Sequence, residues 1–312
     1  HSTGKPREHS DWFLRDEAGE FVTDWEYKDA LHLDPGNEQW QQYVGKTLKD
    51  YVQRYGYDGV FVDLVISTTK YVNLRKNSKA VNPKTGEPYT NSEWKEVNLA
   101  LLRTVRSYIG EKVPLIINGS RGKEYFQTGY YDFFQFADGM CIEGFMGWNL
   151  DPQLPDNFER EEDWKADVDT LADCARRGKI AMVIGNVKQR QGITQEQYER
   201  YYRYITASFL LGKGKQHYVT FFPKVVGRPE RYAPGENILP KFCSASLGEP
   251  RGEYYRAGGI YQRDFEQGKV IVNPSVNKMN VEIDGSWKTV EGDTVVSPIS
   301  LSAHSGVILI KK

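Results

Sequence analysis

The feature that most restricts the possible folds of this chain is a repeated order of segments. In each repeat, a helix with regularly spaced apolar residues precedes a short run of β-branched and aromatic residues. The first repeat covers residues 34–65. Asp34 and Pro35 predict the beginning of a helix, and its apolar residues recur at helical spacing until Gly56. The run 58–65 follows directly and is typical of a parallel strand that is buried on both faces.

Similar units follow along the chain. Thr90 and Glu93 form a capping-box pattern at the beginning of a second helix, which Gly110 ends. Further strands are expected at 113–118, 139–143, 180–186 and 217–222, further helices at 164–178 and 194–212, and a shorter connection at about 125–136. Strands that alternate with helices imply a parallel α/β sheet.

We therefore expect a TIM-type (β/α)8 barrel over residues 1–240. Only five strands are predicted there, whereas a closed barrel of this type has eight. Because the segment 1–34 is polar and loop-like, we expect three strands and their helices upstream of this chain. An incomplete barrel, or a partner that fills the gap, are alternatives that the sequence leaves open.

The last part of the chain has a different pattern. After about residue 254, short stretches of alternating apolar and polar residues are separated by Gly, Asn, Asp and Pro. This pattern predicts short antiparallel strands joined by tight turns. We expect a small antiparallel β-sandwich that forms a second domain over residues 241–312.

Composition and charge narrow the classes of partner. The formal net charge is −1 and Lys and Arg are scattered along the chain, so we expect no nucleic-acid and no membrane partner. The three cysteines are too few and too far apart to predict a metal site or a disulfide framework. No metal-ligand spacing and no phosphate-binding glycine loop is present. We therefore expect neither a metal nor an organic cofactor.

Polar residues follow the predicted strands where catalytic groups of parallel α/β barrels lie, at the carboxyl ends. These residues are Asp63, Asn118, Glu143 and Asn186. Glycoside hydrolysis usually needs two carboxyl groups, and Asp63 and Glu143 supply such a pair. If the first predicted strand is the fourth of the barrel, the two carboxyl groups end strands four and six and face one another across its mouth. Alternatively, Asp63 is a turn residue and Glu143 pairs with a nearby cation. Asn186 is expected to contact substrate.

Other residues near these ends are candidates for substrate binding. Asn118 could bind a sugar hydroxyl or orient a carboxylate, and Arg121 could contact an anionic sugar or pair with a neighbouring carboxylate. Trp148 and Trp12 could stack on a sugar face or pack in the core, because an indole ring combines an apolar face with a polar edge. His217, at the beginning of the last predicted parallel strand, is expected to be buried rather than catalytic.

Several motifs carry a resemblance to a known group of proteins. They are HSDWFLRD at 9–16, LDP at 33–35, DGVFVD at 58–63 and DGMCIEGF at 138–145. Together they resemble glycoside-hydrolase-like barrels that are distantly similar to the α-galactosidase and endo-polygalactosaminidase group, over roughly residues 6–225. In the tail, GKVIVNP at 268–274 and AHSGVIL at 303–309 resemble the β domain that follows many such barrels.

The resemblance implies a function and roles for two residues. It implies a glycoside hydrolase that acts on an oligo- or polysaccharide by a retaining mechanism, with Asp63 as nucleophile and Glu143 as general acid and base. A carbohydrate substrate in turn implies an extracellular or cell-surface location. Because three strands are missing, a separate N-terminal fragment or partner chain is expected to complete the barrel. The alternative is a non-catalytic carbohydrate-binding or structural protein on a degenerate barrel.

Overall fold

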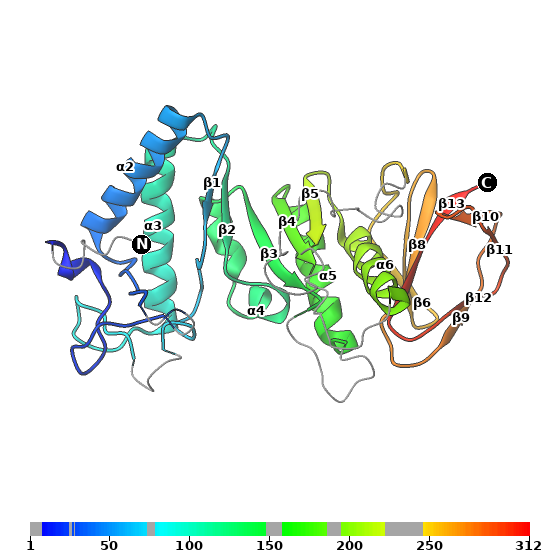
Figure 1. Ribbon diagram of the computed structural model, residues 1–312, viewed down its shortest axis with the longest axis horizontal. Helices are drawn as coiled ribbons and strands as arrows, with labels where there is room; N and C mark the ends of the chain where they lie inside the picture. The colour runs from blue at the N-terminus through cyan, green and yellow to red at the C-terminus, as the bar shows by residue number, and fades with distance from the viewer. Residues whose placement is uncertain are drawn as a thin grey trace. The chain divides into compact units, whose positions relative to one another are not determined.

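A computed structural model of the chain describes residues 8–24, 27, 29–73, 79–147, 158–185, 195–221 and 246–312. The fold is mixed α/β, with a five-stranded parallel sheet and separate antiparallel sheets (Figure 1). The strand order in the parallel sheet is β1-β2-β3-β4-β5. The chain divides into two compact units. Unit 1 comprises His1–Ser120 and Glu124–Met140, and unit 2 comprises Arg121–Lys123 and Cys141–Lys312.

Unit 1 contains two long helices and the first strands of the parallel sheet. Its elements in chain order are η1 (Ser10–Trp12), α2 (Glu38–Tyr55), β1 (Val60–Val62), α3 (Asn91–Ile109), β2 (Leu115–Asn118), most of α4 (Gly122–Gln127) and η2 (Tyr130–Gln135). Helices α2 and α3 pack side by side (Figure 1). Strands β1 and β2 are parallel, with Val60 beside Leu115 and Val62 beside Ile117.

Helix α2 begins three residues later than the sequence predicts. Asn37 is its N-cap, and the Asn37 side chain accepts a hydrogen bond from the Trp40 backbone N–H at 2.9 Å. The Asp34 carboxylate accepts instead from the Gly36 N–H at 2.8 Å and the Tyr89 hydroxyl at 2.9 Å. The prediction of Asp34 as the cap was therefore wrong, because this buried carboxylate binds Tyr89, a residue distant in the sequence.

The remaining ends of the two long helices confirm the sequence prediction. Gly56 ends α2 in the left-handed conformation, with a φ of 67°, which glycine adopts without steric cost. At the beginning of α3, the Glu93 N–H donates to Thr90 Oγ1 and the Thr90 N–H donates to the Glu93 carboxylate, so the capping box is complete. These bonds from Thr90 lower the pKa of Glu93. Gly110 ends α3 as expected.

Strand β1 is less buried than the sequence predicts. Phe61 is 50% exposed and Leu64, just past the strand, is 52% exposed. A strand in the interior of a parallel sheet is covered on both faces and paired on both edges. β1 is instead the first strand in the order, and among the described residues it pairs only with β2. The expectation of a strand buried on both faces was therefore wrong for β1.

Unit 2 contains the rest of the parallel sheet and the antiparallel strands β6 to β13. β3 (Gly139–Phe145) passes from unit 1 into it, and α5 (Glu161–Arg176), β4 (Ile180–Gly185), α6 (Gln195–Gly212) and β5 (His217–Phe221) follow. The antiparallel strands are β6 (Tyr255–Ala257), β7 (Ile260–Asp264), β8 (Gly268–Asn273), β9 (Met279–Val281), β10 (Trp287–Thr289), β11 (Thr294–Val295), β12 (Ile299–Leu301) and β13 (Ser305–Lys311). β4 and β5 are parallel and run in register from Ala181 beside His217 to Gly185 beside Phe221.

The antiparallel strands form one six-stranded sheet and one two-stranded sheet. The order in the larger sheet is β11-β10-β13-β8-β7-β6, and the smaller sheet pairs β12 with β9. One apolar cluster joins the two sheets and consists of Ile260, Ile271, Val281, Ile283, Trp287, Leu301 and Leu309. The short antiparallel strands after about residue 254 were predicted from the sequence.

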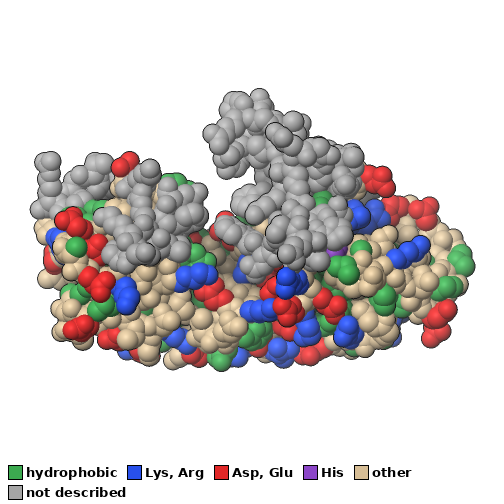
Figure 2. Space-filling view, turned by 90° about the horizontal axis from the view of Figure 1, so that it is seen from below, with side chains coloured by type: hydrophobic (Ala, Val, Ile, Leu, Met, Phe, Trp, Pro, Cys, Tyr) green, Lys and Arg blue, Asp and Glu red, His purple; other side chains and the backbone are tan. Residues whose placement is uncertain are grey.

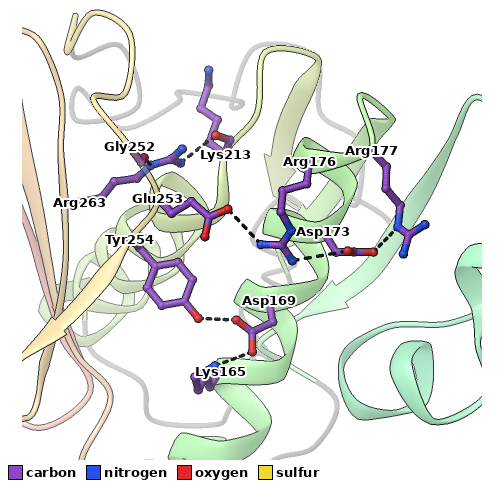
Figure 3. Close-up of polar contacts among 10 residues, drawn as sticks. All are labelled: Lys165, Asp169, Asp173, Arg176, Arg177, Lys213, Gly252, Glu253, Tyr254 and Arg263. Atoms are coloured by element: carbon purple, nitrogen blue, oxygen red, sulfur yellow. Dashed lines mark hydrogen bonds and ion pairs between the residues drawn. The ribbon is translucent and has the colours of Figure 1, made fainter.

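Helix α6 joins the parallel strands of unit 2 to the six-stranded sheet (Figure 1). Toward β5, the rings of Tyr202 and Phe221 lie 4.4 Å apart. Toward β13, Gly306 lies so close that a Cβ there would come within 2.6 Å of the Ala207 side chain. The Arg263 guanidinium donates to the Lys213 carbonyl at the end of this helix, at 2.8 Å (Figure 3). The helix is therefore packed on two sides.

A polar network joins the segment before β6 to helix α5 (Figure 3). The Tyr254 hydroxyl donates to the Asp169 carboxylate, which Lys165 also contacts at 2.6 Å. Glu253 pairs with Arg176 at 3.3 Å. Burial and the bond to Asp169 raise the pKa of Tyr254, so its hydroxyl remains a donor at neutral pH. These contacts fix the first residues of the antiparallel region on α5.

The described surface carries charges of both signs. Figure 2 shows acidic and basic side chains interspersed over the described residues on one face, with neither sign gathered into a large patch. No long-range field of one sign is therefore expected from this face. In the part of the chain that the structure describes, no helix is both long and apolar enough to cross a membrane.

Candidate active site

Asp63 and Asn118 lie side by side in unit 1. The parallel register that pairs Val62 with Ile117 brings the next residues of both strands together. The Asn118 amide donates to Asp63 Oδ1 at 2.9 Å, and the Leu64 backbone N–H donates to the same oxygen at 2.8 Å. No described residue donates to Oδ2, and the Asp63 side chain is exposed. Asn118 therefore orients this carboxylate, which was one of its two predicted roles.

The loops after β1 and β2 meet backbone to backbone. The Val65 N–H donates to the Asn118 carbonyl at 2.8 Å. Gly119 lies against the Val65 carbonyl oxygen, and a Cβ at this position would overlap that oxygen. Leu64 adopts a left-handed φ of 56°, which is unusual for a residue with a branched side chain. The chain after Asp63 thus turns sharply and is held against the end of β2.

Glu143 lies on β3 in unit 2, two residues before the strand ends. It is the one exposed residue of a strand whose other residues are buried. The next residues form a tight turn, in which the Gly147 N–H donates to the Gly144 carbonyl at 2.9 Å. The strand therefore presents the carboxylate outward while the chain on both sides of it is covered.

Arg121 takes part in a buried ion-pair cluster. Its guanidinium contacts Asp167 at 2.6 Å and Glu159 at 3.5 Å. Asp167 also accepts the Met146 backbone N–H at 3.1 Å. Burial opposes the charge on Arg121, but Asp167 and Glu159 raise its pKa. Burial raises the pKa of Asp167 against the opposing effect of Arg121.

The carboxylates around Arg121 were missed by sequence reasoning. A signal for Asp167 is nonetheless present, because it lies in the apolar stripe of α5 between Trp164 and Leu171. A charged residue in such a stripe is rarely buried without a partner, so it predicts a buried cation nearby. Glu159 precedes the helix and offers no comparable periodicity.

The other predicted site residues fall in different environments. Trp12 is 5% exposed, its ring stacks on His9 at 3.9 Å, and it packs against Tyr43. Trp148 and Asn186 lie outside the described residues. Of the residues proposed to bind substrate, the structure thus brings Asn118 next to a predicted catalytic carboxylate.

His217 is buried, as the sequence predicts. Its Nδ1 accepts a hydrogen bond from the Gly214 N–H at 2.9 Å. Burial lowers the pKa of His217 to about 4, and the Lys213 and Arg263 charges contribute in the same direction. The ring is therefore neutral at physiological pH.

A separate cavity of about 540 Å³ lies in unit 1. Its lining comes from residues 10–19, Asp34 and residues 81–88, and includes several carboxylates. Asp63 and Asn118 do not line it. Over the described residues, no group of three or more His, Cys, Asp or Glu side chains is placed to hold a metal ion. The cavity is therefore distinct from the oriented carboxylate.

Fold and site together define an α/β protein with a carboxylate oriented at the carboxyl end of a parallel sheet. The model of the family described as "Hypothetical glycosyl hydrolase family 15" matches residues 1–269. The chain belongs to this family, and the predicted resemblance to glycoside-hydrolase-like proteins is confirmed. A search of curated proteins finds no match to the chain.

Solved structures with a similar chain trace include glycosidases. The noncanonic maltogenic α-amylase AmyB from Thermotoga neapolitana is 15% identical, with a TM-score of 0.49 over 98% of this chain and 71% of that one. An isomalto-dextranase from Arthrobacter globiformis T6 is 13% identical, with a TM-score of 0.47 over 92% of this chain and 51% of that one. The chitinase domain of the spore coat protein CotE from Clostridium difficile is 10% identical, with a TM-score of 0.32 over 74% of this chain and 56% of that one. At these values, the likenesses say nothing about activity.

Proposed function

We propose that this chain carries the catalytic carboxylates of a retaining glycosidase that acts on an oligo- or polysaccharide, with Asp63 as the nucleophile and Glu143 as the general acid and base. Membership of a glycosyl hydrolase family supports the reaction class. The observation that carries the proposal is the hydrogen bond from the Asn118 amide to Asp63.

The bonds to Asp63 suit a nucleophile. Both donors, the Asn118 amide and the Leu64 N–H, contact Oδ1, whereas Oδ2 accepts from no described residue. A neutral amide orients the carboxylate by a hydrogen bond and leaves its negative charge available, whereas a cationic side chain would form an ion pair with it. Oδ2 is then the oxygen that attacks the anomeric carbon, and Oδ1 holds the plane of the carboxylate.

The proposed reaction has two steps. In the first, Asp63 Oδ2 forms a bond to the anomeric carbon while Glu143 protonates the leaving oxygen. In the second, Glu143 removes a proton from water, which attacks the same carbon and releases Asp63. A retaining mechanism requires the two carboxyl groups to lie about 5 to 5.5 Å apart when substrate is bound. Asn118, Trp148 and Asn186 are proposed to contribute to substrate binding around this pair. Arg121, which pairs with Asp167, and Trp12, which is buried against Tyr43, fit instead the structural roles that were their alternatives.

The proposal includes a closed (β/α)8 barrel. Among the described residues β1 pairs only with β2, which leaves the backbone groups of its other edge for a further strand. Three additional β/α units, on a separate N-terminal fragment or a partner chain, would bring the five strands to eight. An extracellular or cell-surface location is proposed because polysaccharides are found there.

The first test is turnover of a panel of aryl α- and β-glycosides by the wild type and by two variants. We expect Asp63→Asn to lower kcat/KM by about 10⁴-fold and Glu143→Gln by about 10² to 10⁴-fold. Asp58→Asn is the matched control, because Asp58 is an exposed carboxylate just before the same strand. This control should keep wild-type activity.

Azide and product stereochemistry test the two roles separately. With Asp63→Ala, azide should restore turnover and give a glycosyl azide of inverted configuration, whereas with Glu143→Ala it should give the retained configuration. NMR of the anomeric proton distinguishes these products. Glycan binding without turnover by the wild type, unchanged in both variants, would instead support a non-catalytic binding protein, a reading that the five-stranded sheet favours.

A further inference from the structure

The turn that follows Glu143 is held in an unfavourable backbone conformation. Gly144 has a φ of 69° and Met146 has a φ of 56°. Glycine adopts such angles freely, but for methionine they are strained. Met146 is also buried. A conformation of this kind persists only where the surrounding structure holds it.

One side chain supplies that support. Asp167 on α5 is 1% exposed, and its Oδ2 accepts the Met146 N–H at 3.1 Å and the Arg121 guanidinium at 2.6 Å. Arg121 is held in turn by Glu159 at 3.5 Å. Asp167 Oδ2 therefore binds both Met146, in the turn after β3, and Arg121, three residues after the end of β2.

The neighbouring backbone is fitted closely to the same carboxylate. Gly122 has a φ of 55°, and a Cβ there would come within 2.7 Å of Asp167 Oδ1. A larger residue would be strained by its backbone angle and would push against the carboxylate. The structure therefore leaves little freedom for Asp167 to change rotamer.

We propose that Asp167 is a positioning residue for Glu143. The inference rests on the proposed function, in which Glu143 is the general acid and base. Only Gly144 and Phe145 separate Glu143 from Met146, and the Phe145 side chain is fully buried. Fixing the Met146 N–H therefore fixes the direction in which β3 ends and the place from which Glu143 projects. A misplacement of about 1 Å at a catalytic group can cost about 100-fold in rate.

The test compares two leaving groups, because only one of them needs protonation. Dinitrophenolate departs without an acid catalyst, whereas phenolate needs one. On the phenyl glycoside of the sugar that wild type hydrolyses best, we expect Asp167→Ala to lower kcat about 10 to 100-fold with KM changed less than about 3-fold. On the dinitrophenyl glycoside of the same sugar, the rate of the glycosylation step, measured as kcat/KM, should fall less than about 3-fold. Asp167→Asn, which keeps an oxygen for the Met146 N–H, should fall between Asp167→Ala and wild type.

Asp173→Asn is the matched control. Asp173 lies on the same helix and pairs with Arg177 at 2.6 Å and with Arg176 at 3.4 Å, near the opposite end of α5 from the residues that precede Asp167. It should behave as wild type on both substrates. An equal loss on both substrates in Asp167→Ala, or no loss on either while Glu143→Gln loses phenyl glycoside turnover selectively, would overturn the positioning role.

A crystal structure of Asp167→Asn or Asp167→Ala provides a readout that does not depend on activity. We expect Met146 to relax toward a negative φ in Asp167→Ala and the Glu143 carboxylate to shift with it. An unchanged turn would overturn the inference even if the enzyme is active. If Glu143→Gln retains full activity, the proposed function fails, and the role of Asp167 in catalysis fails with it, whatever the crystal structure of the turn shows.

Discussion

Strands β1 and β8 are both short apolar runs rich in β-branched residues, but their environments differ. In β8, Val270, Ile271 and Val272 are completely buried between β7 and β13. In β1, Phe61 is half exposed and the strand has one neighbour in the described sheet. The difference shows that an apolar run predicts a strand, whereas its burial depends on what pairs with both of its edges.

Strands of the antiparallel sheet and of the parallel sheet are connected to their neighbours in different ways. Antiparallel strands can be joined by tight hairpins, so β7 and β8 pair within a few residues of one another. Parallel strands need crossover connections, and the neighbours of an edge strand come from distant segments. β7 therefore pairs with β8 locally and β13 covers the other edge of β8 from farther along the chain, whereas no described strand pairs with the outer edge of β1.

The largest expected effect comes from removing side-chain volume in β8. Ile271→Ala should lower the free energy of unfolding by about 3 to 4 kcal/mol, because it leaves a cavity in the apolar cluster of the antiparallel sheets. Urea denaturation measures the change, with the exposed residue Val296→Ala as the control. A loss below about 1 kcal/mol would show that the antiparallel core is no better packed than β1.

The other end of the parallel sheet can be tested by pH. The buried His217 on β5 has a lowered pKa of about 4, so the unfolded chain binds its proton more readily between that value and about 6.5. The contribution of His217 to the free energy of unfolding is therefore fully present above about pH 6.5 and is lost as the pH falls toward about 4. Relative to His217→Asn, the wild type should lose about 2 kcal/mol between pH 8 and pH 5. Parallel pH profiles of the two proteins would show that β5 is as open as β1.

The junction between α5 and the antiparallel region should show an intermediate effect. Tyr254→Phe removes the hydroxyl that donates to Asp169 and should lower the free energy of unfolding by about 1 to 2 kcal/mol. Tyr255→Phe is the matched control, because this neighbouring hydroxyl also donates to a carboxylate, Asp264, but at the surface. Its loss should stay below about 0.5 kcal/mol. Equal losses would mean that burial at the junction adds nothing.

The smallest expected effect is on β1 itself. Phe61→Lys should change the free energy of unfolding of this chain by no more than about 0.5 kcal/mol, because the side chain is half exposed. It should also reduce self-association, since a charged residue on an edge strand discourages pairing with other chains. Thermal unfolding and light scattering measure the two effects. A loss above about 2 kcal/mol would mean that Phe61 is packed more tightly than a half-exposed side chain on an edge strand should be.

Local sequence signals predicted most elements, and the expected order of the parallel strands predicted one contact in the candidate site. The capping box at Thr90 and the glycine that ends α2 depend on neighbouring residues, so the sequence contains the whole interaction. Adjacent strand ends likewise predicted that Asn118 could orient a carboxylate.

Contacts that do not follow from the pairing of neighbouring parallel strands were not predicted. Asp34 binds Tyr89, and nothing in the local pattern around Asp34 distinguishes this bond from a helix cap. Arg121 binds Asp167, although its own neighbourhood offers other carboxylates. In both cases the side chain meets several plausible partners, and only the packing of whole elements selects one of them.

Gly119 has a consequence for how this site can change over generations. Because its α-carbon faces the Val65 carbonyl oxygen, every other amino acid would have to separate the two loops and disturb the contact between Asp63 and Asn118. As long as selection maintains that contact, position 119 should therefore accept only glycine. Lineages that have abandoned the contact should be recognisable by the substitutions that they accumulate there.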